Sequence, residues 1–119
     1  MQDRYEEAGR LYQQALLVYR EIGARLGEAN CVQSLGGLAL QQDRYEEAGR
    51  LYQQALPMHR QIGDRLGEAN CLSMGRLARA TGDTATMRTT YKEAERIYTS
   101  IGLDEWARRA HEEASALVP

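Results

Sequence analysis

Apolar residues recur every three or four positions along most of the chain, which is the spacing of one face of an α-helix. Six such segments are separated by short turns, most of which contain glycine, and short loops make neighbouring helices antiparallel. The pattern predicts an all-α fold without strand. It places helices over residues 3–21, 25–41, 44–61, 65–80, 84–100 and 104–117.

The first of these segments occurs twice in the chain. The sequence QDRYEEAGRLYQQAL runs from Gln2 to Leu16 and again, unchanged, from Gln42 to Leu56. Residues 2–31 and 42–71 are identical at 25 of 30 positions, at a fixed offset of 40. A period of this length indicates a solenoid, in which each unit stacks on its neighbours to bury a continuous core.

Two irregularities interrupt the repeat. Pro57 stands where the first copy has Leu17, and proline inside a helix removes one backbone hydrogen bond, so we expect a kink or an early end there. From Ser73 onward the better offset is 39, so one residue is missing in mid-helix. Because one residue is about 100° of helix, we expect either a tightened turn between Cys71 and Gly75 or a rotated start of that helix.

The composition limits the class of protein. The 119 residues carry a net charge of −2 with a pI near 5.7, which gives no field for attracting nucleic acid or an anionic membrane. No apolar run is long enough to span a bilayer, and the first residues lack the pattern of a secretory signal. Cys31 and Cys71 are equivalent positions of stacked repeats, too far apart for a disulfide. We interpret them as small buried or half-buried thiols in a reducing cytosol, and we expect a cytoplasmic location.

The turns and small residues of the repeat resemble those of a known family. The matching positions are Gly36, the turn Asp43-Arg44-Tyr45, Tyr52 and Ala55, and again Gly75, Gly82, Asp83, Tyr91 and Ala94. They resemble the tetratricopeptide repeat, and the period is similar to the longer variety found in kinesin light chains and cell-polarity scaffolds. The resemblance implies a TPR-like α-solenoid, six antiparallel helices in a right-handed superhelix.

The resemblance also assigns each helix a type, in the order B-A-B-A-B-A. We expect one domain over residues 1–119. It comprises an unpaired helix over 3–22, repeats over 25–62 and 65–101, and an unpaired C-terminal helix over 104–117.

No pattern in the chain indicates catalysis or a bound metal. His59 and His111 are the only histidines, and they lie on different helices. We expect His59 on the helix surface, because it takes the place of Tyr19. Motifs of a nucleophile elbow, a phosphate-binding loop or a zinc site are lacking. We therefore expect a protein that is not an enzyme and needs no cofactor.

The candidate working surface is the polar side of the A helices, which line the concave side of such a stack. The candidate partner-binding residues are Asn30, Gln33, Ser34, Gln41, Asn70, Ser73, Arg76, Arg79 and Arg108. The family holds a bound peptide with asparagines at places that here carry Ser34, Gly37, Ser73 and Arg76. Arginines that converge here, Arg109 among them, would suit an acidic peptide. The alternative is that they are solvated or paired with Asp104, Glu105 and Glu112.

Two functions of different class follow. The leading hypothesis is a non-enzymatic protein–protein interaction scaffold that binds a peptide or partner segment in the concave groove. The alternative is a self-assembling structural repeat, a fragment or engineered piece of a longer array with no ligand of its own. The unpaired end helices predict a homo-oligomer, with two-fold or head-to-tail pairing. The residues expected to mediate it are Tyr5, Leu11, Tyr12, Tyr19 and Trp106.

Overall fold

The structure is a computed structural model that describes residues 2–78 and 84–117, and within them every side chain except those of residues 2, 3 and 76–78. These ranges contain six helices: α1 (Gln2–Ile22), α2 (Arg25–Gln41), α3 (Tyr45–Ile62), α4 (Arg65–Ala78), α5 (Thr84–Ser100) and α6 (Asp104–Ala116). No strand occurs in the described ranges, so the predicted all-α fold is confirmed. The end expected for the fourth helix, at residue 80, lies outside the described residues.

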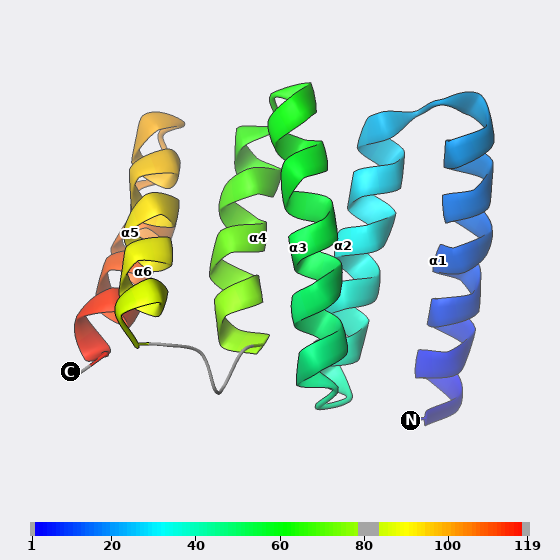
Figure 1. Ribbon diagram of the computed structural model, residues 1–119, viewed down its shortest axis with the longest axis horizontal. Coiled ribbons are helices and arrows are strands. Elements are labelled where there is room, and N and C mark those ends of the chain that lie inside the picture. Colours follow the sequence, from blue (N-terminus) through cyan, green and yellow to red (C-terminus); the bar gives the residue numbers. More distant parts are fainter. Residues whose placement is uncertain (1, 79–83, 118–119) are drawn as a thin grey trace.

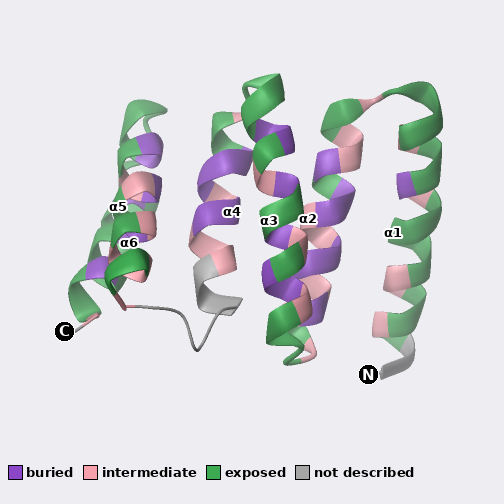
Figure 2. Ribbon diagram, viewed as in Figure 1, coloured by how far each residue is buried: buried purple, intermediate pink, exposed green. Residues whose placement is uncertain are grey.

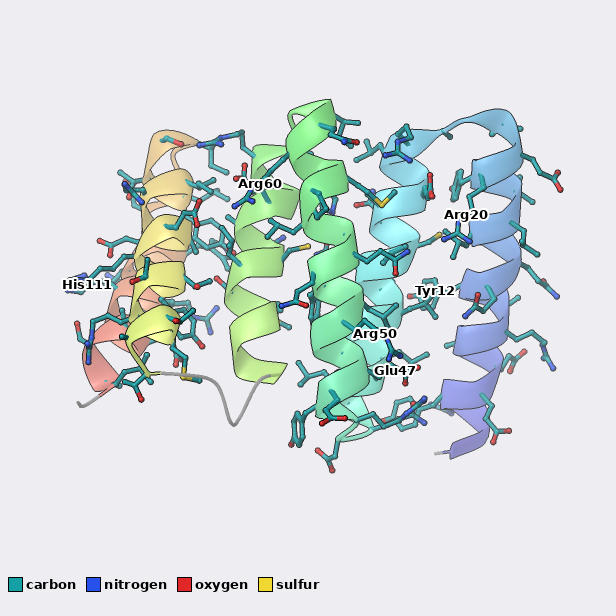
Figure 3. The ribbon with its side chains drawn as sticks, viewed as in Figure 1. Tyr12, Arg20, Glu47, Arg50, Arg60 and His111 are labelled. Atoms are coloured by element: carbon teal, nitrogen blue, oxygen red, sulfur yellow. The ribbon has the colours of Figure 1, made fainter. Side chains whose placement is uncertain are left out.

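The helices follow one another from α1 at one end of the molecule to α5 and α6 at the other (Figure 1). Each helix packs mainly against the helices before and after it in sequence, and α2 also touches α4. Figure 3 shows Arg20 on α1 at one end and His111 at the other. None of the helices in the described ranges combines the length and the apolar character needed to cross a membrane. The expected right-handed superhelix stays a prediction.

The helices α1, α3 and α5 end in the same way. Gly23, Gly63 and Gly102 follow them with φ of 72°, 75° and 82°, a left-handed conformation that glycine adopts without steric cost. The next residue then donates its backbone N–H to a carbonyl five positions earlier, as Ala24 does to Tyr19 at 2.9 Å. This hydrogen bond is the mark of a Schellman motif. It turns the chain directly into the following helix, as the glycine spacing predicted.

Two apolar clusters form the core, and α4 contributes to both. The first cluster contains residues of α1, α2, α3 and α4. They are Leu16, Cys31, Val32, Leu35, Ala39, Ala48, Tyr52, Ala55 and Cys71. The second joins α4, α5 and α6 through Ala69, Leu72, Ala94, Ile97, Tyr98, Ala107 and Ala110. Leu56 packs against both clusters, which links them. Figure 2 shows buried residues on every helix, but α1 is exposed over most of its length.

Glycines of α2 and α4 lie on two sides of Tyr52. A Cβ atom added to Gly36 would be 3.3 Å from the Tyr52 ring, and one added to Gly75 would be 3.3 Å from the Cβ of Tyr52. Tyr52 is only 2% exposed, and its burial raises the pKa of the phenol to about 12. Gly36 therefore lets the tyrosine ring lie close to the backbone of α2.

Both cysteines are free and buried, as expected. Burial raises the pKa of the Cys71 thiol to about 12. The thiol therefore stays protonated at neutral pH and acts as a small apolar side chain.

The early end expected at Pro57 is wrong, because α3 continues through Pro57 to Ile62. Proline removes only one hydrogen bond. The residues on both sides of it are held by packing, since Ala55, Met58 and His59 are all buried. Tertiary contacts therefore outweigh the local preference.

The tightened turn expected between Cys71 and Gly75 is also wrong, because residues 65–78 form one regular α-helix. The start of α4 buries the same side as the start of α2. The matching pairs, each buried in both helices, are Ala29 and Ala69, Cys31 and Cys71, and Val32 and Leu72. The start is therefore not rotated relative to the core. The helix continues through the point where the offset changes from 40 to 39 without a break.

Candidate partner-binding groove

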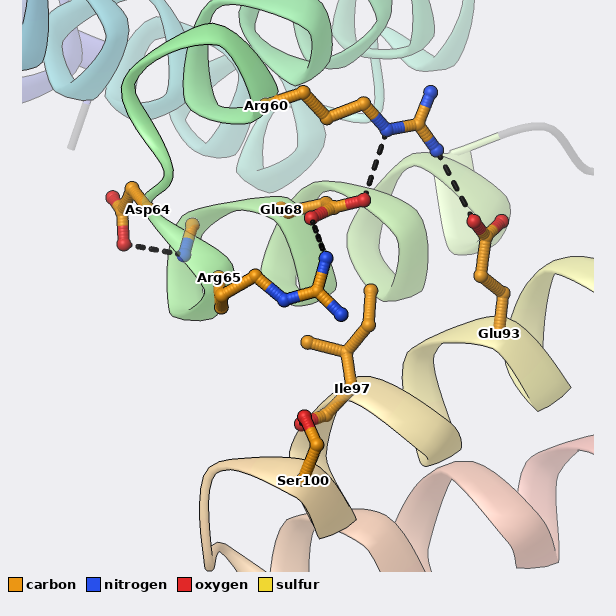
Figure 4. A network of polar contacts seen from close by, with 8 residues as sticks. Arg60, Asp64, Arg65, Glu68, Glu93, Ile97 and Ser100 are labelled. Atoms are coloured by element: carbon orange, nitrogen blue, oxygen red, sulfur yellow. Dashed lines mark hydrogen bonds and ion pairs between the residues drawn. The ribbon is translucent and has the colours of Figure 1, made fainter.

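A polar junction fixes the start of α4 against the preceding helix. Glu68 accepts hydrogen bonds from Arg60 of α3 at 2.9 Å and from Arg65 of α4 at 2.8 Å. Arg60 also reaches Glu93 of α5 at 3.3 Å (Figure 4). Glu28, the copy of Glu68 in α2, makes the same two arginine contacts, both at 3.1 Å. A buried carboxylate such as Glu68 needs these partners, so the junction holds the start of α4, and its copy the start of α2, in a set rotation.

The imidazole of His59 lies beneath the polar face of α2. His59 is fully buried, so the expectation that it lies on the helix surface is wrong. Its Nε2 is 2.9 Å from Gln33 Oε1, and its Nδ1 is 2.9 Å from Asp64 Oδ2, out of line for a hydrogen bond. Gly67 leaves room for the ring, because a Cβ atom there would collide with it. The ring thus fixes the position of the Gln33 side chain through this hydrogen bond.

A groove runs across the three A helices, α2, α4 and α6, with α3 and α5 beneath. Its cavity has a volume of about 550 Å³, within the usual range of ligand sites. Its apolar floor is formed mainly by aromatic side chains: Tyr52, Tyr91, Tyr98 and Trp106. Its polar lining consists of Gln33, Ser34, Asn70, Ser73, Arg109 and Glu113. Gly37, Met74 and Ala110 complete it. We call this site the groove.

The α6 side of the groove has an organised aromatic corner. The rings of Tyr98 and Trp106 are 6.0 Å apart, tilted by 38°, and the guanidinium of Arg109 lies 5.5 Å from the Trp106 ring. Tyr98 donates its hydroxyl hydrogen to Asn70 Oδ1 at 2.6 Å. Burial raises the pKa of Tyr98, which keeps this donor protonated. The bond occupies the carbonyl of Asn70 and leaves its amide nitrogen as a donor for other groups.

Comparison with known families decides what this architecture is. The family model of the tetratricopeptide repeat matches residues 1–61 and 28–100. The chain belongs to the tetratricopeptide repeat family. The matched residues include the helices α2 to α5 that carry most of the groove. No curated protein matches the chain.

The structure separates the candidate groove residues of this tetratricopeptide protein into three sets. Four of them, Gln33, Ser34, Asn70 and Ser73, line the groove together. Asn30, Gln41 and Arg108 are exposed and lie outside the lining. Arg108 is 3.9 Å from Glu105 in an exposed pair, as the alternative for the arginines foresaw. The side chains of Arg76 and Arg79 lie outside the described residues.

The residues predicted for self-association lie in different places. Trp106 belongs to the groove, and Tyr5 lines a separate cavity of about 390 Å³ between α1, α2 and α3. Tyr19 is half-buried against α2, whereas Leu11 is exposed. Tyr12 extends from α1 on the side that faces α2 in Figure 3 and is 36% exposed.

Sequence reasoning missed the aromatic floor because Tyr52, Tyr91 and Tyr98 belong to the apolar spacing that marks the core side of a helix. They do reach the core, but their edges also line the groove, and no periodicity separates these two roles. The role of His59 had a visible signal. Between the two copies, Tyr19 becomes His59 and, five positions later, Ala24 becomes Asp64. The two changes form a pair, since their side chains meet.

Proposed function

We propose that the protein is an interaction module whose groove binds a peptide segment of a partner protein. Tetratricopeptide repeats generally mediate protein–protein interaction. The observation that carries the proposal is the composition of the groove. A cavity of about 550 Å³ places an aromatic floor beside groups that can bind a peptide backbone.

The floor favours a partner with a large apolar or aromatic anchor side chain. Trp106 is 49% exposed and offers its ring to such an anchor, while Tyr98, 2% exposed, lies 6.0 Å behind it, and aromatic pairs add to the free energy of burial. Burial of such an anchor supplies most of the binding energy in peptide recognition.

The polar lining favours an extended or helical segment held by its backbone. Ser34 and Ser73 offer hydroxyl groups, while Gln33 and Asn70 offer their amide nitrogens, because their oxygens already bond to His59 and Tyr98. A peptide carbonyl that loses water in the groove must find such a donor. The lining thus provides orientation, and the aromatic floor provides affinity.

Arg109 gives the groove a charge preference. Its guanidinium lies on the Trp106 ring at the edge of the cavity, where it can bind a carboxylate with two parallel hydrogen bonds. Glu113 lies one helical turn further along α6, where its carboxylate would repel a second acidic group of the bound segment. The proposed ligand is therefore a segment with an aromatic anchor and one acidic group close to it.

A selected peptide provides the test. Peptides from a displayed random library are selected on the chain, and binding is measured by calorimetry for the wild type, Trp106→Ala and Arg109→Glu. Each variant should weaken binding at least about tenfold. Tyr45→Ala serves as the matched control, because Tyr45 is an exposed aromatic residue outside the groove. The proposal fails if the three variants bind alike, or if selection enriches no aromatic peptide.

A further inference from the structure

A face of α1 next to the one that packs on α2 carries exposed apolar side chains. Leu11, Val18 and Ile22 are 55%, 53% and 69% exposed. The half-buried Ala8 and Ala15 complete the row, so positions 8, 11, 15, 18 and 22 follow one another at intervals of three and four, and Ala15 also packs against the first apolar cluster. This is the spacing of the seam between two helices of a coiled coil. We call these five residues the α1 seam.

The second copy of the same sequence shows what such a face does when a helix covers it. Ala48, Ala55 and Met58 of α3 occupy the places of positions 8, 15 and 18. Ala48 and Ala55 are fully buried and Met58 nearly so. The two alanines belong to the cluster that holds Val32 and Leu35 of α2. Leu51, at the place of Leu11, is half-buried, and Ile62, at the place of Ile22, is 38% exposed, so a packed helix buries three of the five places.

The opposite end of the molecule does not supply a matching surface. The side of α6 away from the core carries Glu105, Arg108 and Glu112, all exposed. Docking this side on the seam would bury charges against apolar groups, which is costly without partners. Head-to-tail assembly through α6 is therefore disfavoured, and the seam must match another surface.

We propose that two copies of this chain pair through α1, with the two helices antiparallel about a two-fold axis. The proposed register pairs Ala8 with Val18 of the second copy, and Ala15 with its Leu11. Each small side chain then lies opposite a large one, which lets the two seams interdigitate. Pairing of one surface with itself also closes the assembly at two copies.

The charges at the ends of α1 suit the same register. Arg4 and Glu21 are exposed near opposite ends of the helix. In the antiparallel pair, Arg4 of one copy lies beside Glu21 of the other, and the contact occurs twice. A parallel pair would instead place Arg4 beside Arg4. The charges therefore favour the antiparallel arrangement.

Sedimentation equilibrium from low micromolar to near-millimolar concentration tests the pairing. The wild type should approach twice the chain mass of 13.4 kDa and go no further. Leu11→Glu should raise the dimer dissociation constant at least about 100-fold, because each dimer loses two buried leucines. Leu17→Glu is the matched control, since Leu17 is 60% exposed on the same helix but outside the seam. Circular dichroism checks that both variants keep their helix content.

A charge exchange tests the register. Arg4→Glu and Glu21→Arg should each weaken the dimer alone, because each places like charges together. An equal mixture of the two single variants should pair again, since both contacts then join opposite charges. A wild type that stays monomeric, grows beyond a dimer, or loses pairing equally in Leu17→Glu would overturn the proposal. A mixture no better paired than its components would overturn the antiparallel register.

Discussion

Replacing Gly67 with alanine tests the packing beneath His59. A Cβ atom at this position would lie 2.5 Å from Asp64 Oδ2 and collide with Nδ1 and Cε1 of His59. The ring cannot move into solvent, because it is fully buried and its Nε2 is held 2.9 Å from Gln33 Oε1. The substitution must therefore displace either the ring or the backbone of α4.

The magnitude follows from three contributions. Overpacking a filled site costs about 1–3 kcal/mol, and loss of the hydrogen bond between His59 and Gln33 costs about 1 kcal/mol. Removal of a glycine from the helix interior returns about 1 kcal/mol. The expected net destabilisation is about 1–3 kcal/mol, which lowers the Tm of a domain of this size by roughly 4–12 °C.

Two other glycines serve as controls in thermal and urea unfolding followed by circular dichroism. Gly27→Ala makes the same change beneath Tyr19, which is half-buried and can swing outward, so the loss should be smaller. Gly9→Ala should stabilise by up to about 1 kcal/mol, because its Cβ would make an ordinary contact of 3.4 Å with Leu38. The reasoning is refuted if Gly67→Ala is as stable as Gly9→Ala. It is also refuted if prior replacement of His59 by alanine does not reduce the cost.

Three further changes probe the rest of the fold. Pro57→Leu, which copies the first repeat, should stabilise the protein by up to about 3 kcal/mol by restoring a backbone hydrogen bond; an unchanged urea midpoint would contradict this. Glu68→Ala should cost more stability than any exposed glutamate, because it leaves two arginines without their buried partner; equal cost for Glu46→Ala would exclude that role. Stability should fall as pH rises from 9 to 12. In the unfolded chain Cys71 and Tyr52 have their ordinary pKa values of 9.0 and 10.0, whereas burial raises both pKa values to about 12 in the folded protein. The stability is thus fully present below pH 9 and declines by about 1.4 kcal/mol per pH unit for each group; Cys71→Ala should remove the part of the decline that begins at pH 9.

The six helices of the described residues, and the ends of α1, α3 and α5, could be predicted from the sequence because their causes are local. Apolar spacing marks each helix, and glycine after α1, α3 and α5 permits the left-handed turn that ends it. The early end expected at Pro57 is wrong because the local cost of proline is smaller than the contribution of packing around Met58 and His59. The tightened turn expected in the fourth helix is also wrong, since the helix continues unbroken through the point where the residue is missing.

Only the polar part of the groove could be predicted from the sequence. The polar positions of the A helices predicted Gln33, Ser34, Asn70 and Ser73, because a helical-wheel projection shows which residues lie opposite the apolar side of a helix. It cannot show that Trp106 turns into the groove beside Tyr98. That placement depends on how α6 packs on α5, and a projection of a single helix contains no information about its neighbour.

The duplicated segment separates what each level determines. Residues 2–16 and 42–56 are identical, and both are helical, because propensity and apolar spacing act within the segment itself. Yet Tyr52 is 2% exposed and Tyr12 is 36% exposed. The ring of Tyr52 lies against Gly36 of α2, whereas no helix of the described residues precedes α1 to cover Tyr12 in the same way. The sequence by itself determines that the segment is a helix and which side is apolar. Only the tertiary structure decides whether that side is core or surface, because burial depends on a neighbour that the segment does not contain.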